Sequence, residues 1–132
     1  MPQESADAQI VLAVIRGQVP LSTLAQAGVS FDFQADPGQE SMEIRVIQKR
    51  RFEVRPDIRD IASGLLRYAA DQDARSVWAS LLLAADWIAF EPLEREPDWD
   101  CLLDGIWDAS FRLDVNEAAV QAAHRVQADK VR

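Results

Sequence analysis

Aspartates recur every four residues in a segment where apolar spacing predicts a helix over residues 99–110. Asp100, Asp104 and Asp108 fall on one face of such a helix, because residues four apart are neighbours on its surface. Three neighbouring carboxylates could carry out acid/base chemistry, hold a metal ion or attract the basic side chains of a partner. Like charges at this spacing disfavour a helix by roughly 0.2–0.5 kcal/mol per pair. We therefore expect asparagine at all three positions to leave folding intact or slightly stabilised.

Catalysis and metal binding have no further support in the sequence. Acid-rich magnesium sites usually accompany a phosphate-binding motif, and catalytic carboxylate pairs need a defined separation across a cleft. The chain contains no glycine-rich phosphate loop, no His/Cys metal spacing and no nucleophile elbow. We interpret the only histidine, His124, as a surface residue and Cys101 as a structural thiol. We expect no catalytic residue, no metal and no cofactor.

Two interpretations of the three aspartates remain. They form either a solvated surface or a recognition surface for lysine and arginine side chains of a partner. Acidic residues in the segment before the helix extend the row of aspartates. Tryptophans lie close to these acids in sequence, and tryptophan often dominates protein interfaces. Trp99 and Trp107 fall on the predicted buried stripe, although a large ring is often only partly covered. The predicted partner-binding residues are Glu91, Glu94, Glu96, Asp98, Asp100, Asp104, Trp107 and Asp108.

The distribution of charge favours a protein partner. The net charge is -8, and residues 86–108 hold eight acids against Arg95 alone. This charge disfavours binding to nucleic acid or to an anionic membrane and favours a basic protein. Six bases cluster between Arg45 and Arg59, with Phe52 as the only aromatic residue among them. We interpret this basic cluster as an internal or intersubunit complement to the acids, the latter in a homodimer, rather than as a nucleic-acid site.

Length and composition predict a single domain over residues 1–132. Hydrophobic residues make up 48% of the chain, which suffices for one core but, at this length, not for two.

The N-terminus has no basic segment before its first apolar run, and a single cysteine excludes an internal disulfide. Both features predict a cytoplasmic protein. Crossing a bilayer takes about 20 apolar residues. The longest apolar run is shorter and acids follow it directly, so we do not expect it to span a membrane.

That apolar run, residues 76–90, predicts a buried helix around which the other elements pack. Trp78 and Leu82 should belong to the core. Asp86 would lie on the polar edge of this helix, and we expect its carboxylate to pair with a base of the 44–60 segment.

Apolar spacing and capping residues predict five further helices. Ser5 should cap the first and Gly17 end it, and Asp114 with Glu117 should start the last. Alternating apolar residues predict two or three antiparallel strands near residues 29–54, the third around Phe52 and Val54. The predicted fold class is α+β and predominantly helical, with about six helices. Their ranges are residues 5–17, 21–27, 56–69, 76–90, 99–110 and 114–129.

Four segments resemble a known group of proteins when taken in order. They read Val-Arg-Pro-Asp-Ile at 54–58, Gly-Leu-Leu at 64–66, Val-Trp-Ala at 77–79 and Leu-Leu-Asp-Gly-Ile-Trp-Asp-Ala-Ser-Phe at 102–111. Over residues 54–111 this pattern resembles small acidic helical immunity proteins encoded beside bacterial polymorphic toxins. The resemblance implies a protein that neutralises a cognate toxin by tight binding, and such families share no catalytic residues.

The resulting hypothesis is a non-enzymatic inhibitor of a basic protein, with a toxin domain as one candidate partner. The segment from residue 91 to residue 108 would form the contact surface. Two alternatives stay open: an adaptor or chaperone-like interaction module, and a small enzyme that uses the clustered aspartates.

Overall fold

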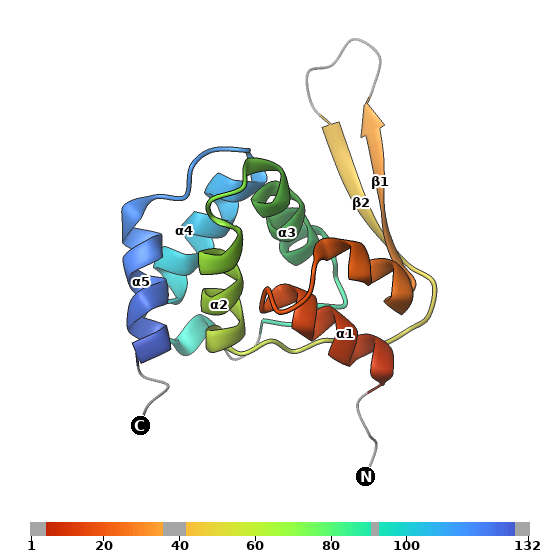
Figure 1. The fold of residues 1–132 in the computed structure, drawn as a ribbon, viewed down its shortest axis with the longest axis horizontal. Coiled ribbons are helices and arrows are strands. Elements are labelled where there is room, and N and C mark those ends of the chain that lie inside the picture. The colour runs from red at the N-terminus through yellow and green to blue at the C-terminus, as the bar shows by residue number, and fades with distance from the viewer. Residues whose placement is uncertain (1–4, 36–41, 91–92, 129–132) are drawn as a thin grey trace.

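The computed structural model describes residues 5–35, 42–90 and 93–128 (Figure 1). Within these ranges the chain forms five α-helices, two 3₁₀-helices and one two-stranded antiparallel sheet. This confirms the predicted mostly helical α+β class. In chain order the elements are α1 (Ala6–Ile15), η1 (Leu21–Ala27), β1 (Val29–Ala35), β2 (Met42–Gln48), α2 (Ile58–Tyr68), α3 (Gln72–Ala84), η2 (Leu93–Arg95), α4 (Trp99–Ser110) and α5 (Glu117–Ala128).

The helices form a body from which the β1–β2 hairpin projects (Figure 1). Helix α2 packs against each of the other four α-helices, so it lies at the centre of this body. The α3 helix contacts α2, α4, η1 and β2 and thereby joins the hairpin to the helices. No helix in the described ranges is long and apolar enough to cross a membrane.

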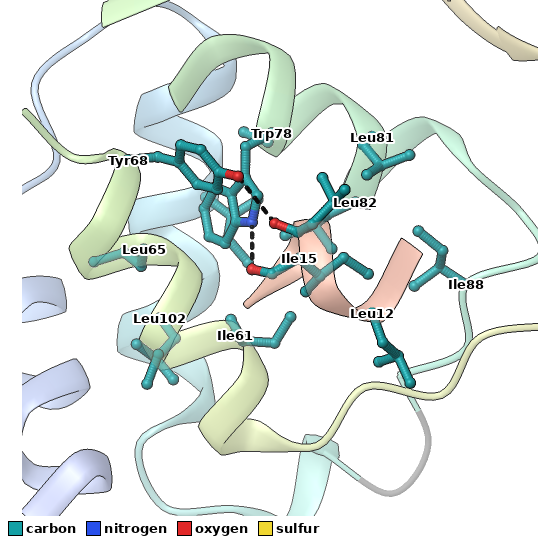
Figure 2. Close-up of a cluster of buried hydrophobic side chains, with 14 of the residues drawn as sticks. Leu12, Ile15, Ile61, Leu65, Tyr68, Trp78, Leu81, Leu82, Ile88 and Leu102 are labelled. Carbon is teal, nitrogen blue, oxygen red and sulfur yellow. Dashed lines mark hydrogen bonds between the residues drawn. The ribbon is translucent and has the colours of Figure 1, made fainter. Parts of the chain in front are cut away.

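Trp78 of α3 lies at the centre of the core and is fully buried, as is Leu82, which confirms both predictions. The Trp78 indole Nε1 donates a hydrogen bond to the carbonyl oxygen of Ile15 at 3.0 Å, and the Tyr68 hydroxyl donates to that of Val14 at 3.0 Å (Figure 2). Carbonyls in the last turn of a helix have no partner within the helix. Trp78 therefore satisfies the last carbonyl of α1, and Tyr68 adds a second donor to Val14, which also accepts from the Gly17 N–H at 3.0 Å.

The first two helices begin and end close to the predicted residues. The Ser5 Oγ accepts a hydrogen bond from the Ala8 N–H at 3.0 Å and caps α1. Gly17 and Gly28 follow α1 and η1 with φ of 78° and 73°, the left-handed conformation that closes a helix. The second helix is of the 3₁₀ type.

The predicted buried helix over residues 76–90 is wrong at both ends, because α3 spans Gln72–Ala84. After Ala85 the chain becomes irregular and passes beside Val54: the Val54 N–H donates to Trp87 at 3.0 Å and the Ala89 N–H donates to Val54 at 2.9 Å. This isolated parallel bridge stands where a third strand was predicted.

Asp86 consequently lies outside the helix. Its side chain is exposed and forms no ion pair with any residue of the described ranges, so the predicted pairing with the 44–60 segment is wrong. Exposure explains the difference, since a solvated carboxylate needs no protein partner.

Two other helices begin later than predicted. Helix α2 begins at Ile58 rather than at Pro56, and Asp57 and Asp60 form a capping box at its start. Helix α5 begins at Glu117, and the Asn116 Oδ1 accepts from the Ala119 N–H at 2.9 Å in the capping role predicted for Asp114. The predicted inward-facing residues of α5 are all buried: Ala119, Ala122, Ala123 and Val126.

Candidate functional site

Helix α4 presents three of the predicted acidic residues, Asp100, Asp104 and Asp108, on the outside of the helical body. Trp99, Leu102, Ile106 and Ala109 are buried and hold one side of the helix against the core. The α3 and α5 helices pack along this inner side. The opposite side carries the aspartates, as the spacing of four residues predicts.

The aspartates at the two ends of the α4 segment hold other parts of the fold. The Asp98 Oδ1 accepts from Arg125 Nη2 at 2.8 Å and from Arg125 Nε at 3.2 Å, which ties the start of α4 to α5. This hydrogen bond raises the pKa of the Arg125 guanidinium above its usual value. The Asp108 Oδ2 accepts from the Asn116 side-chain Nδ2 at 2.7 Å and from its backbone N–H at 3.2 Å. Asp108 thus positions the residue that caps α5.

The two middle aspartates differ from these. Asp100 and Asp104 are exposed, and in the described ranges neither forms a hydrogen bond or an ion pair through its side chain. They lie one turn apart on the same surface of α4. Their charges remain available to a group from outside the protein.

An exposed pair of aromatic rings lies on the same side of α4. Trp107 is 47% exposed and Phe111 is 68% exposed. Their rings are stacked, with centroids 6.0 Å apart and an angle of 23° between the planes. Asp104 precedes Trp107 by one helical turn and Asp100 by two, which places these four residues along one stripe. We call the stripe formed by Asp100, Asp104, Trp107 and Phe111 the acidic-aromatic face.

The C-terminal end of α4 holds the aromatic pair in place. The Leu113 N–H donates to the Asp108 carbonyl at 2.9 Å and the Arg112 N–H to that of Ala109 at 3.0 Å, the hydrogen-bond pattern of a Schellman ending. Arg112 has a φ of 61°, a conformation that favours glycine. Leu113, in the same turn, is 56% exposed.

Residues of α3 hold that turn from the other side. The Gln72 Nε2 donates to the Arg112 carbonyl at 2.9 Å, and the Arg112 guanidinium contacts Asp73 at 2.6 Å. The buried Arg75 donates from Nε to the Leu113 carbonyl at 3.1 Å and from Nη2 to Asp114 at 2.9 Å. A third bond joins its Nη1 to the Ala69 carbonyl at 3.0 Å. Arg75 was not among the predicted residues, because its only signal in the sequence is an arginine beside an apolar run.

The predicted contact surface is therefore divided. Glu96 is exposed and lies with Asp98 near the start of α4, beside a hollow that Arg59 and Val126 also line. Glu91 lies outside the described residues. So does the side chain of Glu94, whose backbone belongs to η2. Of the predicted set, the structure brings together Asp100, Asp104 and Trp107 as an exposed group and adds Phe111.

The basic cluster is partly neutralised within the protein, by Asp7 and by Glu53 rather than by acids of residues 86–108. The Arg50 Nε contacts Asp7 at 2.6 Å, and this hydrogen bond lowers the pKa of the Asp7 carboxyl below its usual value. Arg55 contacts Glu53 at 2.7 Å. Lys49 and Arg51 are exposed and form no ion pair with another described residue.

Other locations offer less organised chemistry. An open hollow of about 540 Å³ lies at the base of the hairpin and is lined in part by Arg51, Phe52, Asp86 and Trp87. His124 is exposed and Cys101 is a half-buried free thiol. Among the residues that the structure describes, no group of three His, Cys, Asp or Glu side chains is placed to hold a metal ion.

Fold and surface together define a mostly helical α+β protein with an acidic-aromatic face on its fourth α-helix. Comparison of the chain with models of known families, with curated proteins and with solved structures finds no match.

Proposed function

We propose that this protein is a non-enzymatic binding protein that recognises a basic partner protein through the acidic-aromatic face. The observation that carries the proposal is the exposed Trp107–Phe111 ring pair on the same stripe as two aspartates without partners in the described ranges. Exposed aromatic rings are typical anchors of protein interfaces. A basic partner would cover the rings and neutralise the carboxylates at the same time.

The contacts that support the face favour this function. Trp107 stacks on Phe111, and the turn after α4 is held by hydrogen bonds from Gln72 and Arg75. A surface whose side chains already have their bound conformation loses little entropy on association. Such a surface suits tight binding, which an inhibitor requires.

The partner we propose is a toxin domain with a basic surface. Two observations support it: the net charge of -8 and the resemblance of residues 54–111 to immunity proteins. Nuclease toxins are basic where they hold their substrate. An acidic protein bound there would block the substrate without any chemistry of its own.

Affinity capture from the native host tests the proposal. Wild-type protein should retain a basic protein, and co-expression should suppress the toxicity of that protein. The double variant Asp100→Asn/Asp104→Asn should bind more weakly, chiefly because association slows, and the difference should shrink as salt screens the charges.

A matched control removes two charges elsewhere. Glu53 and Asp86 are exposed acids at the base of the hairpin, and Glu53→Gln/Asp86→Asn changes the net charge by the same amount. This control should keep most of the wild-type affinity. Equal binding by wild type and the Asp100→Asn/Asp104→Asn variant at every salt concentration would exclude the acidic-aromatic face as the binding surface.

A further inference from the structure

We infer that the acidic-aromatic face recognises arginine rather than basic side chains in general. In the bound state a guanidinium of the partner stacks on the Trp107 ring and bonds to the Asp104 carboxylate. This inference rests on the proposed function and specifies the side chain that the partner presents. Its starting point is the division of the aspartates of α4: Asp98 and Asp108 are bound within the protein, whereas Asp100 and Asp104 are not.

The arrangement of the face favours one position for the cation. Phe111 lies one turn after Trp107 and stacks against its ring at a centroid distance of 6.0 Å. Asp104 lies one turn before Trp107, and Cβ atoms at this helical spacing are about 5–6 Å apart. A cation on the side of the Trp107 ring away from Phe111 therefore lies within reach of the Asp104 carboxylate. Asp100 adds a second negative charge one turn further along the helix.

Arginine fits this position better than lysine. The guanidinium is planar, so it can stack on an indole ring and still donate hydrogen bonds from its edge to a carboxylate. The lysine ammonium is a compact, strongly hydrated charge and gains less from the aromatic surface. An apolar side chain would cover the rings but would leave two carboxylates unpaired beside a dry interface, which is unfavourable.

Short peptides test the inference on the full chain without the natural partner. Acetyl-tetra-arginine amide is titrated into the protein while the four tryptophan indole N–H signals are followed by NMR. The Trp107 signal, assigned with Trp107→Leu, should shift the most. Acetyl-tetra-lysine amide should bind roughly two- to five-fold more weakly, the range expected when a cation–π contact at an exposed site is lost. The neutral tetra-citrulline peptide should not bind.

Variants separate stacking from simple charge attraction. Trp107→Leu should weaken tetra-arginine binding by roughly two- to five-fold and leave tetra-arginine and tetra-lysine equal. Asp104→Asn should weaken both peptides, whereas Asp86→Asn, which removes an exposed charge at the base of the hairpin, should change neither. Circular dichroism should be the same for all three variants.

Equal binding of the two cationic peptides to wild type, or equal loss of both in Trp107→Leu, would overturn the arginine inference. That result would leave the proposed function standing, because a basic partner can bind through lysines. Conversely, partner capture that is insensitive to Asp100→Asn/Asp104→Asn would overturn the proposed function, whatever the peptides do.

Discussion

The aspartates of α4 have identical side chains and similar neighbours in sequence, yet their partners divide them into two kinds. Asp98 and Asp108 bind Arg125 and Asn116, whereas Asp100 and Asp104 face solvent. The spacing of residues 100, 104 and 108 predicted a common face but could not reveal that Asn116 binds Asp108. That bond depends on how the loop before α5 returns to α4, and helical periodicity contains no information about it.

A first prediction follows from this division. Asp108→Ala should lower the free energy of unfolding by about 1–2 kcal/mol, because it leaves the Asn116 donors without their acceptor at the start of α5. Asp104→Ala should leave stability unchanged or raise it by roughly 0.2–0.5 kcal/mol for each like-charge pair removed, those with Asp100 and with Asp108. Urea denaturation measures both. Stability of Asp108→Ala equal to that of wild type would contradict the structural role assigned to Asp108, and the sequence-based expectation of harmless neutralisation at all three positions would then stand.

A second prediction concerns Tyr68, the single tyrosine of the chain. Burial raises the pKa of its hydroxyl above the usual value, an effect that the nearby Arg67 charge partly offsets. Because the pKa is higher in the folded than in the unfolded protein, the stabilisation that Tyr68 provides is complete below about pH 10 and is lost as the pH rises through the folded-state pKa. Phenolate absorbance should therefore develop at higher pH in the native protein than in urea.

The variant Tyr68→Phe is the control for this titration. It removes the hydroxyl that donates to the Val14 and Val19 carbonyls. Its stability should be lower near neutral pH and should depend less on pH above about 10 than that of wild type. Identical titration midpoints for native and denatured wild type would show that Tyr68 is not buried as described.

At the scale of single elements, the sequence predicted regular, amphipathic segments well. The range of α4 and the ends of η1 agree with the expected residues, because apolar spacing and left-handed glycines are local signals. The run over residues 76–90 was misjudged because apolar content reports burial rather than conformation. Residues after Ala85 stay near the core as extended chain beside Val54.

Helical periodicity did not predict that Trp107, a residue of the candidate site, is exposed. Its spacing from Leu103 suggested a place on the buried stripe, yet the buried residues of α4 are centred on Leu102 and Ile106. The stripe is set by the angle at which α3 and α5 pack against α4, which a single sequence does not specify. The exposure of Trp107 and its stacking on Phe111 thus became visible only in three dimensions.

A third prediction tests the contact between α1, α2 and α3. A Cβ atom at Gly64 would lie 2.0 Å from the Ile15 carbonyl oxygen and 2.7 Å from the Trp78 Nε1. Gly64→Ala should therefore separate these helices and break the Trp78 hydrogen bond, destabilising the protein by about 1–3 kcal/mol or more despite the better helix propensity of alanine.

The exposed Arg67 of the same helix provides a control, since surface substitutions usually change stability by less than about 0.5 kcal/mol. Thermal denaturation of Gly64→Ala, Arg67→Ala and wild type gives the comparison. Equal melting temperatures for all three would mean that α1 does not approach α2 as closely as described.

At the scale of the whole molecule, the body and the hairpin differ in how they are supported. The buried core extends from Ala8 of α1 to Val126 of α5 and includes residues of every α-helix. The hairpin consists of two strands, of which Phe31 and Val46 are half-buried against the core and Ile47 is largely exposed. A two-stranded sheet on its own is only marginally stable in water.

The fourth prediction is that the hairpin opens before the body unfolds. Amides of β2 should exchange with solvent at a lower opening free energy than those of Leu81 and Leu82 in α3, and their exchange should depend little on denaturant. Native-state hydrogen exchange at increasing urea concentration measures both quantities. If the β2 amides matched those of α3 in opening free energy and in urea dependence, the hairpin would belong to the same cooperative unit as the helices.

The unequal burial of the tryptophans gives the protein an optical signal of its own. Trp78 and Trp99 are shielded by the core, whereas Trp107 is nearly half exposed to solvent. A neutral quencher such as acrylamide should reach Trp107 first, and a bound molecule on this helix would shield it. Occupancy of the surface can thus be followed on unlabelled protein, through the fraction of indole emission that escapes quenching.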